Sequence, residues 1–170
     1  MTEAELDWLA MQAGRASVIL EIGVWKGRST RALCDGTSGA VFAVDAWPFP
    51  AVSPAYWELH AEGKGRAAII AEARENLADH LASGKLFIIE MESLAFLRTL
   101  APVLFGHRKP DLIFIDGDHR PDHVRKEIEL CRETLLTPGG VLCGHDLTEV
   151  NPALEGLRHR VAVDTIWVLD

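Results

Sequence analysis

Residues 17–34, which read SVILEIGVWKGRSTRALC, decide the fold of this chain. A mainly apolar run ends at Gly23, and a helix-forming stretch begins near Ser29. A continuous run that stops at a glycine is typical of a strand buried on both faces of a parallel sheet. The stretch therefore predicts a strand, a tight turn and a helix, which together are the repeating unit of α/β folds.

The same alternation continues outward from this stretch. Apolar runs predict further strands at residues 40–45, 86–90, 111–116, 141–143 and 165–169, and helical patterns lie at residues 3–13, 29–34, 66–82, 93–100 and 121–136. Strands that alternate with helices imply right-handed crossovers and a sheet covered on both faces. We therefore expect a single domain over residues 1–170, with a Rossmann-like, doubly wound α/β fold and a mostly parallel sheet.

The connection at residues 46–65 is too long for an ordinary loop between such elements, and it is rich in prolines and large aromatic residues. We interpret it as a lid or functional insertion. The alternative is a hydrophobic loop that only packs against the core.

Composition and charge exclude several classes of protein. Of the 170 residues, 48% are apolar and 25% are charged, which is ordinary for a folded chain. The net charge is −8 and Lys and Arg form no long run, so we expect a small-molecule partner and no nucleic acid. No stretch resembles a membrane span of ~20 apolar residues or a secretory leader, and the three cysteines are scattered. We therefore expect a cytoplasmic protein with reduced thiols and no membrane partner.

The turn after the first strand offers contacts for a ligand. Gly23 and Gly27 stand where the backbone must turn sharply, and the amides of the next helix, with Ser29 and Thr30, could bind an anionic group. The alternative is a tight turn with no ligand.

The pattern of this turn disfavours a dinucleotide. Trp25 stands where the fingerprint G-x-G-x-x-G needs its middle glycine, so a pyrophosphate would be crowded. Glu21, at the end of the strand, is better suited to position a ligand that carries an amino group. The turn therefore favours a nucleotide that contains an amino acid.

Further cofactor contacts are expected after the next strands. Asp45 closes the second strand, where a carboxylate can accept hydrogen bonds from both ribose hydroxyls. Glu92 and Ser93 follow the third strand, where an adenine ring would lie, although Ser93 is also suited to cap a helix. The predicted cofactor-binding set is completed by Lys26, Trp47 and Asp116.

Acidic and histidine side chains gather after the fourth and fifth strands. Asp116, Asp118 and His119 follow the fourth strand, and His145 and Asp146 follow the fifth. Ligands of open α/β sheets bind beyond the carboxyl ends of the strands, so these loops should meet there. Three carboxylates at one edge are costly unless a cation compensates them. The pattern therefore predicts a divalent metal, with magnesium as the first choice; His145 also admits manganese, iron or another metal that accepts nitrogen ligands.

The same edge also carries candidate catalytic bases. His119 is the first choice for the catalytic base because an imidazole titrates near neutrality, and Asp118 is the second.

These motifs resemble a known family. The runs VILEIGVWKGRST, FAVDAW, DLIFIDGDHRPDHVRKEIEL and LTPGGVLCGHD are similar to the class I methyltransferases related to macrocin O-methyltransferase and to the cephalosporin hydroxylase-like group. The resemblance covers residues 17–147. It implies S-adenosylmethionine as the methyl donor, a small hydroxylated acceptor, and magnesium held by Asp116, His145 and Asp146. It also places the base on His119 or Asp118.

The chain departs from this family in two respects. Several relatives have two adjacent acids where this chain has His145-Asp146. Larger relatives also carry a long N-terminal extension that caps the site. Residues 46–65 or a second copy of the chain could cover the pocket instead, so a homo-oligomer is a further expectation.

Other functions fit part of the pattern. Asp116-x-Asp118 after a strand is also found in haloacid-dehalogenase-like phosphatases, but their nucleophile strand normally comes first and later loops supply a lysine and further acids. A nucleotide-binding module without catalysis would share the turn at Gly23. An NAD enzyme is disfavoured by Trp25.

Overall fold

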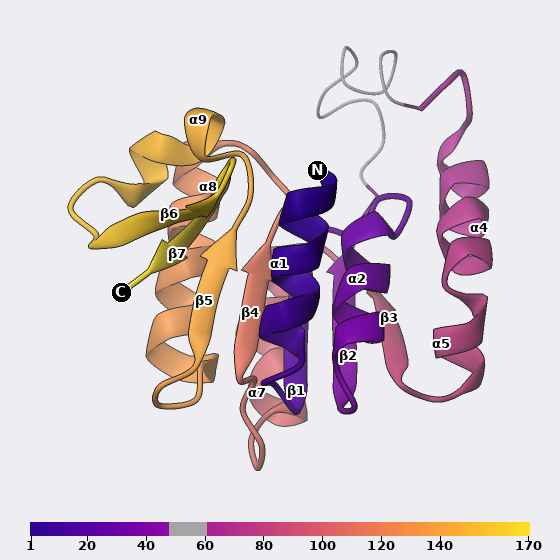
Figure 1. The fold of residues 1–170 in the computed structure, drawn as a ribbon, viewed down its shortest axis with the longest axis horizontal. Coiled ribbons are helices and arrows are strands. Elements are labelled where there is room, and N and C mark those ends of the chain that lie inside the picture. The colour runs from indigo at the N-terminus through magenta and orange to yellow at the C-terminus, as the bar shows by residue number, and fades with distance from the viewer. Residues whose placement is uncertain (48–60) are drawn as a thin grey trace.

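The computed structural model describes residues 1–47 and 61–170, and within them the strands form a seven-stranded sheet in the order β3-β2-β1-β4-β5-β7-β6 (Figure 1). The strands are β1 (Val18–Ile22), β2 (Ala40–Asp45), β3 (Leu86–Glu90), β4 (Leu112–Ile115), β5 (Val141–Gly144), β6 (His159–Val163) and β7 (Ile166–Leu169). Strands β1 to β5 pair in parallel, whereas β7 is antiparallel to both of its neighbours. The expected Rossmann-like, mostly parallel sheet is confirmed.

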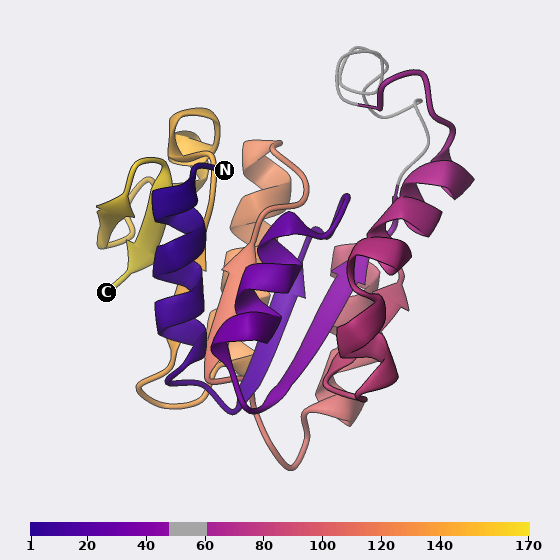
Figure 2. The same ribbon diagram turned by 45° about the vertical axis from the view of Figure 1, so that its right-hand side comes forward.

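Helices cover both faces of the sheet, as Figure 2 shows from a second side. One layer holds α1 (Glu3–Ala13), α2 (Arg28–Gly36), α4 (Arg66–Asn76) and α5 (Ala78–Ala82). The other layer holds α6 (Ser93–Thr99), α7 (Ala101–Leu104), α8 (Pro121–Leu130) with its π-helical last turn η1 (Cys131–Leu135), α9 (Leu147–Val150) and the 3-10 turn η2 (Asn151–Leu154).

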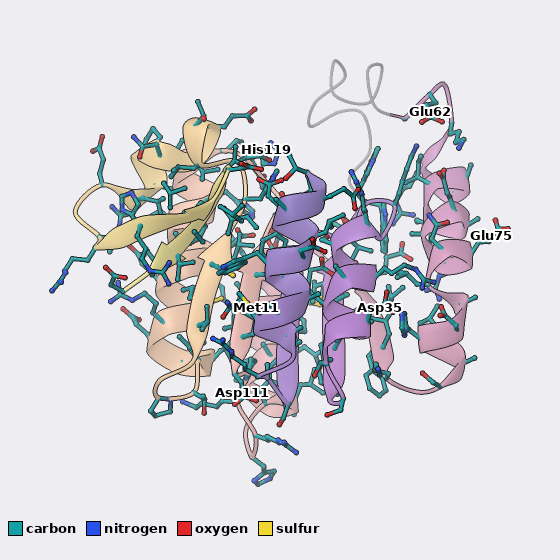
Figure 3. The ribbon with its side chains drawn as sticks, in the orientation of Figure 1. Met11, Asp35, Glu62, Glu75, Asp111 and His119 are labelled. Carbon is teal, nitrogen blue, oxygen red and sulfur yellow. The ribbon has the colours of Figure 1, made fainter. Side chains whose placement is uncertain are left out.

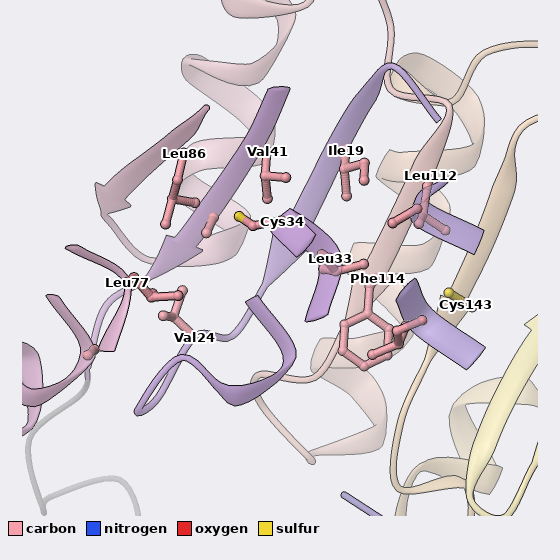
Figure 4. Close-up of a cluster of buried hydrophobic side chains, with 14 of the residues drawn as sticks. Ile19, Val24, Leu33, Cys34, Val41, Leu77, Leu86, Leu112, Phe114 and Cys143 are labelled. Carbon is pink, nitrogen blue, oxygen red and sulfur yellow. The ribbon is translucent and has the colours of Figure 1, made fainter. Parts of the chain in front are cut away.

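The core has two halves because successive side chains of a strand point to opposite faces of the sheet. Ile19 and Phe114 join the half that contains Leu33 of α2 (Figure 4). Leu20 and Ile113 join the other half, with side chains of α6 and α8. Strands β1 and β4 are buried on both faces, which explains their uninterrupted apolar runs.

The structure corrects one expected helix and adds elements that the sequence did not predict, namely α7, α9, η2 and β6. The helix expected over residues 66–82 is two helices, because the backbone at Leu77 leaves the helical region (φ −115°, ψ 12°). Strand β6 is absent from the sequence prediction, since its residues are half-buried or exposed and include Arg160, so they form no apolar run. The other expected strands and helices are present, with small shifts at their ends.

The predicted lid at residues 46–65 lies largely outside the described residues, because residues 48–60 are not among them. It therefore stays a prediction. All three cysteines are buried and free, as expected of reduced thiols. Within residues 1–47 and 61–170, no helix is long and apolar enough to cross a membrane.

Candidate active site

The turn after β1 lies directly against the end of β4. The Gly23 backbone has a φ of +96°, and a Cβ atom there would stand 2.2 Å from the Asp116 carbonyl oxygen. The Gly23 amide donates to the Val44 carbonyl at 2.8 Å, and the Asp116 amide donates to the Ile22 carbonyl at 2.8 Å. A glycine is therefore required here by backbone conformation and by space.

Helix α2 begins with backbone amides that no side chain of residues 1–47 and 61–170 caps. Gly27 is its N-cap, in the left-handed region at φ +86°, and makes no side-chain cap hydrogen bond. Ser29 instead turns inward, where its hydroxyl donates to Glu21 Oε1 at 2.6 Å, and Thr30 is fully buried. The amides of the first turn thus remain as donors for an anionic group, whereas the two hydroxyls face the interior.

Glu21 is fully buried between β1 and α2. Its Oε2 atom makes no hydrogen bond to the described residues, and burial raises the pKa of Glu21 to about 8, against the opposing effect of the Ser29 hydroxyl. Near neutral pH the Glu21 side chain is therefore a neutral carboxylic acid behind the turn. Its predicted contact with a ligand stays a prediction.

Asp45 shapes the turn as well as the end of β2. Its Oδ2 accepts the amides of Val24 and Trp25 at 2.8 and 2.9 Å, and its Oδ1 accepts the Trp47 amide at 2.6 Å. A carboxylate has about four acceptor positions, so three of them are occupied and about one remains for a ligand hydroxyl.

Trp47 and Lys26 have partners within the protein. The Trp47 side chain is buried in the core, where its indole nitrogen donates to the Trp25 carbonyl at 2.9 Å. The Lys26 ammonium pairs with Glu62 at 2.9 Å and with Glu72 at 3.6 Å. Both side chains are thus engaged by other residues of the protein. Their predicted contacts with a cofactor remain predictions.

The turn after β3 is tied to α8. Glu92, rather than Ser93, caps α6, with its carboxylate accepting the amides of Leu94 and Ala95 at 3.1 and 2.7 Å. The Ser93 hydroxyl lies 2.9 Å from Nε2 of His123. The suggestion that Ser93 is the helix cap is therefore corrected to Glu92.

His123 also faces the fully buried Glu127, with 3.2 Å between Nε2 and Oε1. The Glu127 side chain raises the pKa of His123 and outweighs the burial that lowers it. Ser93 and Glu127 both approach Nε2, and Asp118 Oδ2 lies 3.6 Å from Nδ1 on the opposite side of the ring. These contacts join the start of α6 to α8.

Acids and histidines gather beyond β4 and β5 in what we call the rim: Asp116, His119, His145 and Asp146. Ligand atoms of Asp116, His119 and Asp146 lie within 4.8 Å of one another. His119 Nε2 is 3.0 Å from Asp146 Oδ2, and its Nδ1 is 3.2 Å from Glu149 Oε2. Figure 3 places His119 at this edge of the sheet. The predicted meeting of the two loops is confirmed by these distances.

The His145 imidazole lies between carboxylates on both sides. Its Nδ1 is 3.0 Å from Asp146 Oδ1 and 3.5 Å from Asp116 Oδ1, and its Nε2 is 3.1 Å from Glu5 Oε2. Burial lowers the pKa of His145, but the hydrogen bonds to Asp116 and Asp146 outweigh it and raise the pKa to about 10. In the absence of another cation, the imidazolium itself compensates the two acids.

Charges within the rim also shift the pKa values of its other titrating groups. Hydrogen bonding to Asp146 raises the pKa of His119. Burial raises the pKa of Asp116, whereas the pKa of Asp146 is held well below its usual range because its bonds to His119 and His145 outweigh burial. The rim is therefore built of ion pairs between imidazoles and carboxylates.

Asp118 lies beside the rim and is paired with Arg120. Burial would raise its pKa, but hydrogen bonds from Arg120 outweigh burial and lower it; the Arg120 amide lies 2.8 Å and its Nε 3.0 Å from Asp118 Oδ1. The structure therefore brings His119 into the rim and leaves Asp118 in a salt bridge.

Several residues of the site were not found in the sequence. Glu5, Glu149 and Thr165 contact the rim histidines, and Arg66 donates to the carbonyls of Ala46 and Trp47 at the end of β2. For these residues the sequence carries no local signal, because their partners are distant along the chain. His123 and Glu127 do carry one, since an acid four residues after a histidine falls on the apolar stripe of a helix.

Solved structures of known proteins share this fold. The O-methyltransferase TomG from Streptomyces achromogenes, in complex with SAM, is 16% identical with a TM-score of 0.70, over 99% of this chain and 80% of that one. An O-methyltransferase from Bacillus cereus, in complex with SAH, is 20% identical with a TM-score of 0.63, over 100% and 82%. The fold is therefore that of the class I methyltransferases.

A family model described as a methyltransferase domain matches residues 20–147. The chain belongs to this methyltransferase family. A comparison with curated proteins gave no significant match. The family match favours a methyltransferase over the phosphatase and the NAD enzyme considered above.

Proposed function

We propose that this protein transfers the methyl group of S-adenosylmethionine to an oxygen atom of a small hydroxylated acceptor, with a divalent cation at the rim. One observation carries the proposal: Asp116 joins the two halves of the site. Its carbonyl packs under the Gly23 turn, and its carboxylate faces His145 in the rim. A methyl donor bound at the turn would thus lie next to an acceptor bound at the rim.

The donor side, meaning residues 21–30 together with Asp45, fits the parts of S-adenosylmethionine. The uncapped amides of α2 suit the carboxylate of its amino-acid part, and the remaining acceptor position of Asp45 suits a ribose hydroxyl. The complexes of TomG with SAM and of the Bacillus cereus enzyme with SAH support this assignment, since they show that the shared fold accommodates such ligands.

The rim fits a divalent cation by its donor set. Two carboxylates and one imidazole within 4.8 Å of one another suit magnesium or manganese. Asp116 and Asp146 would hold the ion, with Nδ1 of His145 as a further ligand, which would leave His119 for proton transfer. When bound, the ion would supply positive charge that lowers the pKa of the acceptor hydroxyl.

The chain's own residues would position the acceptor and take its proton. The acceptor oxygen forms a bond to the methyl carbon while the carbon–sulfur bond breaks, which leaves S-adenosylhomocysteine, and the hydroxyl proton passes to a base. His119 is the better candidate base, because an acceptor that engages Asp146 would release Nε2 of His119. Asp118 is the weaker candidate, since its pairing with Arg120 lowers its pKa.

A methyl-transfer assay tests this proposal. The chain would be incubated with S-adenosylmethionine labelled in the methyl group and with separate sets of phenols and sugars, with Mg²⁺, with Mn²⁺ or with excess EDTA. We expect labelled O-methyl product that depends on the cation and is lost in Asp116→Ala and Asp146→Ala, whereas the exposed Glu133→Ala control keeps it.

Equal turnover in excess EDTA would refute the cation. Tight S-adenosylhomocysteine binding without transfer to any acceptor would favour a binding module without catalysis.

A further inference from the structure

Glu5 of α1 is an acid in an unusual position. Together with Thr2 it forms a capping box at the start of the helix, a place where such side chains normally face solvent. Glu5 is instead 1% exposed. Figure 1 shows the start of α1 at the same edge of the sheet as the carboxyl ends of β4 and β5, which is the edge that carries the rim.

The Glu5 carboxylate is saturated with donors. Oε1 accepts the amide and the hydroxyl of Thr165 at 3.0 and 2.8 Å, and Oε2 accepts the Thr2 amide at 2.7 Å and faces His145 Nε2 at 3.1 Å. Burial would raise the pKa of Glu5, but these contacts outweigh it and lower the pKa to about 2. A capping box alone needs only the Thr2 contact, so the remaining donors require another explanation.

The hydrogen bonds define which nitrogen of His145 carries a hydrogen. The Thr165 hydroxyl has one hydrogen, which it donates to Glu5 Oε1, so it can only accept from His145 Nε2 at 2.9 Å. Nε2 therefore carries the hydrogen. The lone pair of a neutral His145 ring would then be on Nδ1, the nitrogen that faces Asp146 Oδ1 and Asp116 Oδ1.

The backbone of His145 is fixed as firmly as its ring. Its amide donates to the Ile115 carbonyl at 3.1 Å, and its carbonyl accepts the indole N–H of Trp167 at 3.0 Å. With Glu5 and Thr165 on one ring nitrogen, the ring has little freedom to turn Nδ1 away from the two aspartates.

We infer that Glu5, assisted by Thr165, is a positioning residue that fixes the His145 ring with Nδ1 directed at the ion-holding space between Asp116 and Asp146. A carboxylate behind a histidine is the usual support of a metal-binding imidazole, because it sets the ring orientation and raises its basicity. The inference rests on the proposed function. It assigns a role in the rim to two residues outside the span of 20–147 that the family model matches.

The chain offers well-matched variants for a test. Glu5→Gln removes the charge but keeps a side chain that capping boxes accept. Thr165→Val removes the hydroxyl and keeps the backbone bond to Glu5. Glu3→Gln is the control, since Glu3 is exposed on the same helix and pairs with Arg28.

Two measurements at pH 7 decide the matter. Titration calorimetry with Mn²⁺ alone should show a loss of affinity of about 10–100-fold in Glu5→Gln and a smaller loss in Thr165→Val. The ¹H and ¹⁵N resonances of His145 Nε2–H should report a strong hydrogen bond in the wild type and in Glu3→Gln, and a weaker one in Glu5→Gln and Thr165→Val. Urea unfolding should show that Glu5→Gln remains folded.

An unchanged His145 spectrum in both Glu5→Gln and Thr165→Val would overturn the inference, as would unchanged Mn²⁺ affinity in a wild type that binds the ion. A wild type that binds no Mn²⁺ defeats the metal part of the proposed function, and the ring spectrum then decides the role of Glu5 by itself.

Discussion

The donor side and the rim compensate their acidic groups in different ways. On the donor side, Asp45 accepts three backbone amides of neighbouring turns, and Glu21 is buried as a neutral acid. In the rim, the acids face imidazoles that come from other loops. Amides that belong to the fold cannot leave, whereas a cation or a ligand could take over contacts that the imidazoles make with the rim acids. Changes on the donor side should therefore affect folding, and changes in the rim should mainly affect ligands.

The largest expected effect is the pH dependence caused by Glu21. Its pKa is about 8 in the folded chain and near 4.5 when unfolded, so between these values the folded state holds a proton that the unfolded state has released. The free energy of unfolding should then fall as pH rises from 4.5 to 8, by at most about 1.4 kcal/mol per unit from this group. Urea unfolding across this range should show a flatter profile for Glu21→Gln.

The control for this profile is Glu75→Gln, since the Glu75 side chain is exposed on α4 (Figure 3). Identical slopes for Glu21→Gln and the control would mean that Glu21 is ionised within the folded chain.

Gly23→Ala should destabilise the fold by about 3–5 kcal/mol, or prevent folding. The left-handed backbone strain and the overlap with the Asp116 carbonyl both contribute. Gly84→Ala is the matched control, because Gly84 has a φ of +73° but open space around its Cβ position. Denaturant unfolding of Gly84→Ala should show only the cost of the left-handed backbone, a loss of about 1–2 kcal/mol in the free energy of unfolding. Similar losses in both variants would contradict the close approach at Gly23.

His123→Leu should cost about 3 kcal/mol, because it leaves Glu127 as an unpaired buried acid. The double variant His123→Leu/Glu127→Met should recover most of this loss, since both partners are then apolar. Thermal and urea unfolding would measure both, with the exposed Asp122→Ala as control. No recovery in the double variant would show that His123 acts through another partner.

Asp45→Ala should cost about 2 kcal/mol of stability and also weaken S-adenosylhomocysteine binding, because the turn loses an acceptor for three amides. Asp146→Asn should cost less stability, since Asp146 is partly exposed and the asparagine oxygen can still accept a hydrogen bond from His119 or His145. Its main loss should be in Mn²⁺ affinity. Unfolding and calorimetry on both variants would test this contrast, and the reverse order of stabilities would contradict it.

The sequence predicted those parts of the fold whose signal is local. Strands such as β1 and β4 are buried on both faces and therefore read as apolar runs. The meeting of Asp116 with Asp146 followed from topology, because the ends of neighbouring parallel strands share one edge. Strand β6 escaped prediction because an exposed edge strand needs no apolar pattern.

The contacts of individual side chains were less predictable. Asp45 and Ser29 are in the expected places, but the sequence does not reveal that they bond to the turn and to Glu21. Glu5 could not be assigned to His145, because 140 residues separate them and only the packing of α1 brings them together. Sequence patterns thus place residues at an edge, and packing decides what each one contacts.

A crystal structure with S-adenosylhomocysteine and Mn²⁺, with the anomalous signal of manganese recorded, tests the central claim most directly. We predict the nucleoside between the Gly23 turn and Asp45, with its amino-acid part toward the start of α2, and a manganese peak between Asp116 and Asp146. A crevice without nucleoside, or a peak remote from these two aspartates, would contradict the account.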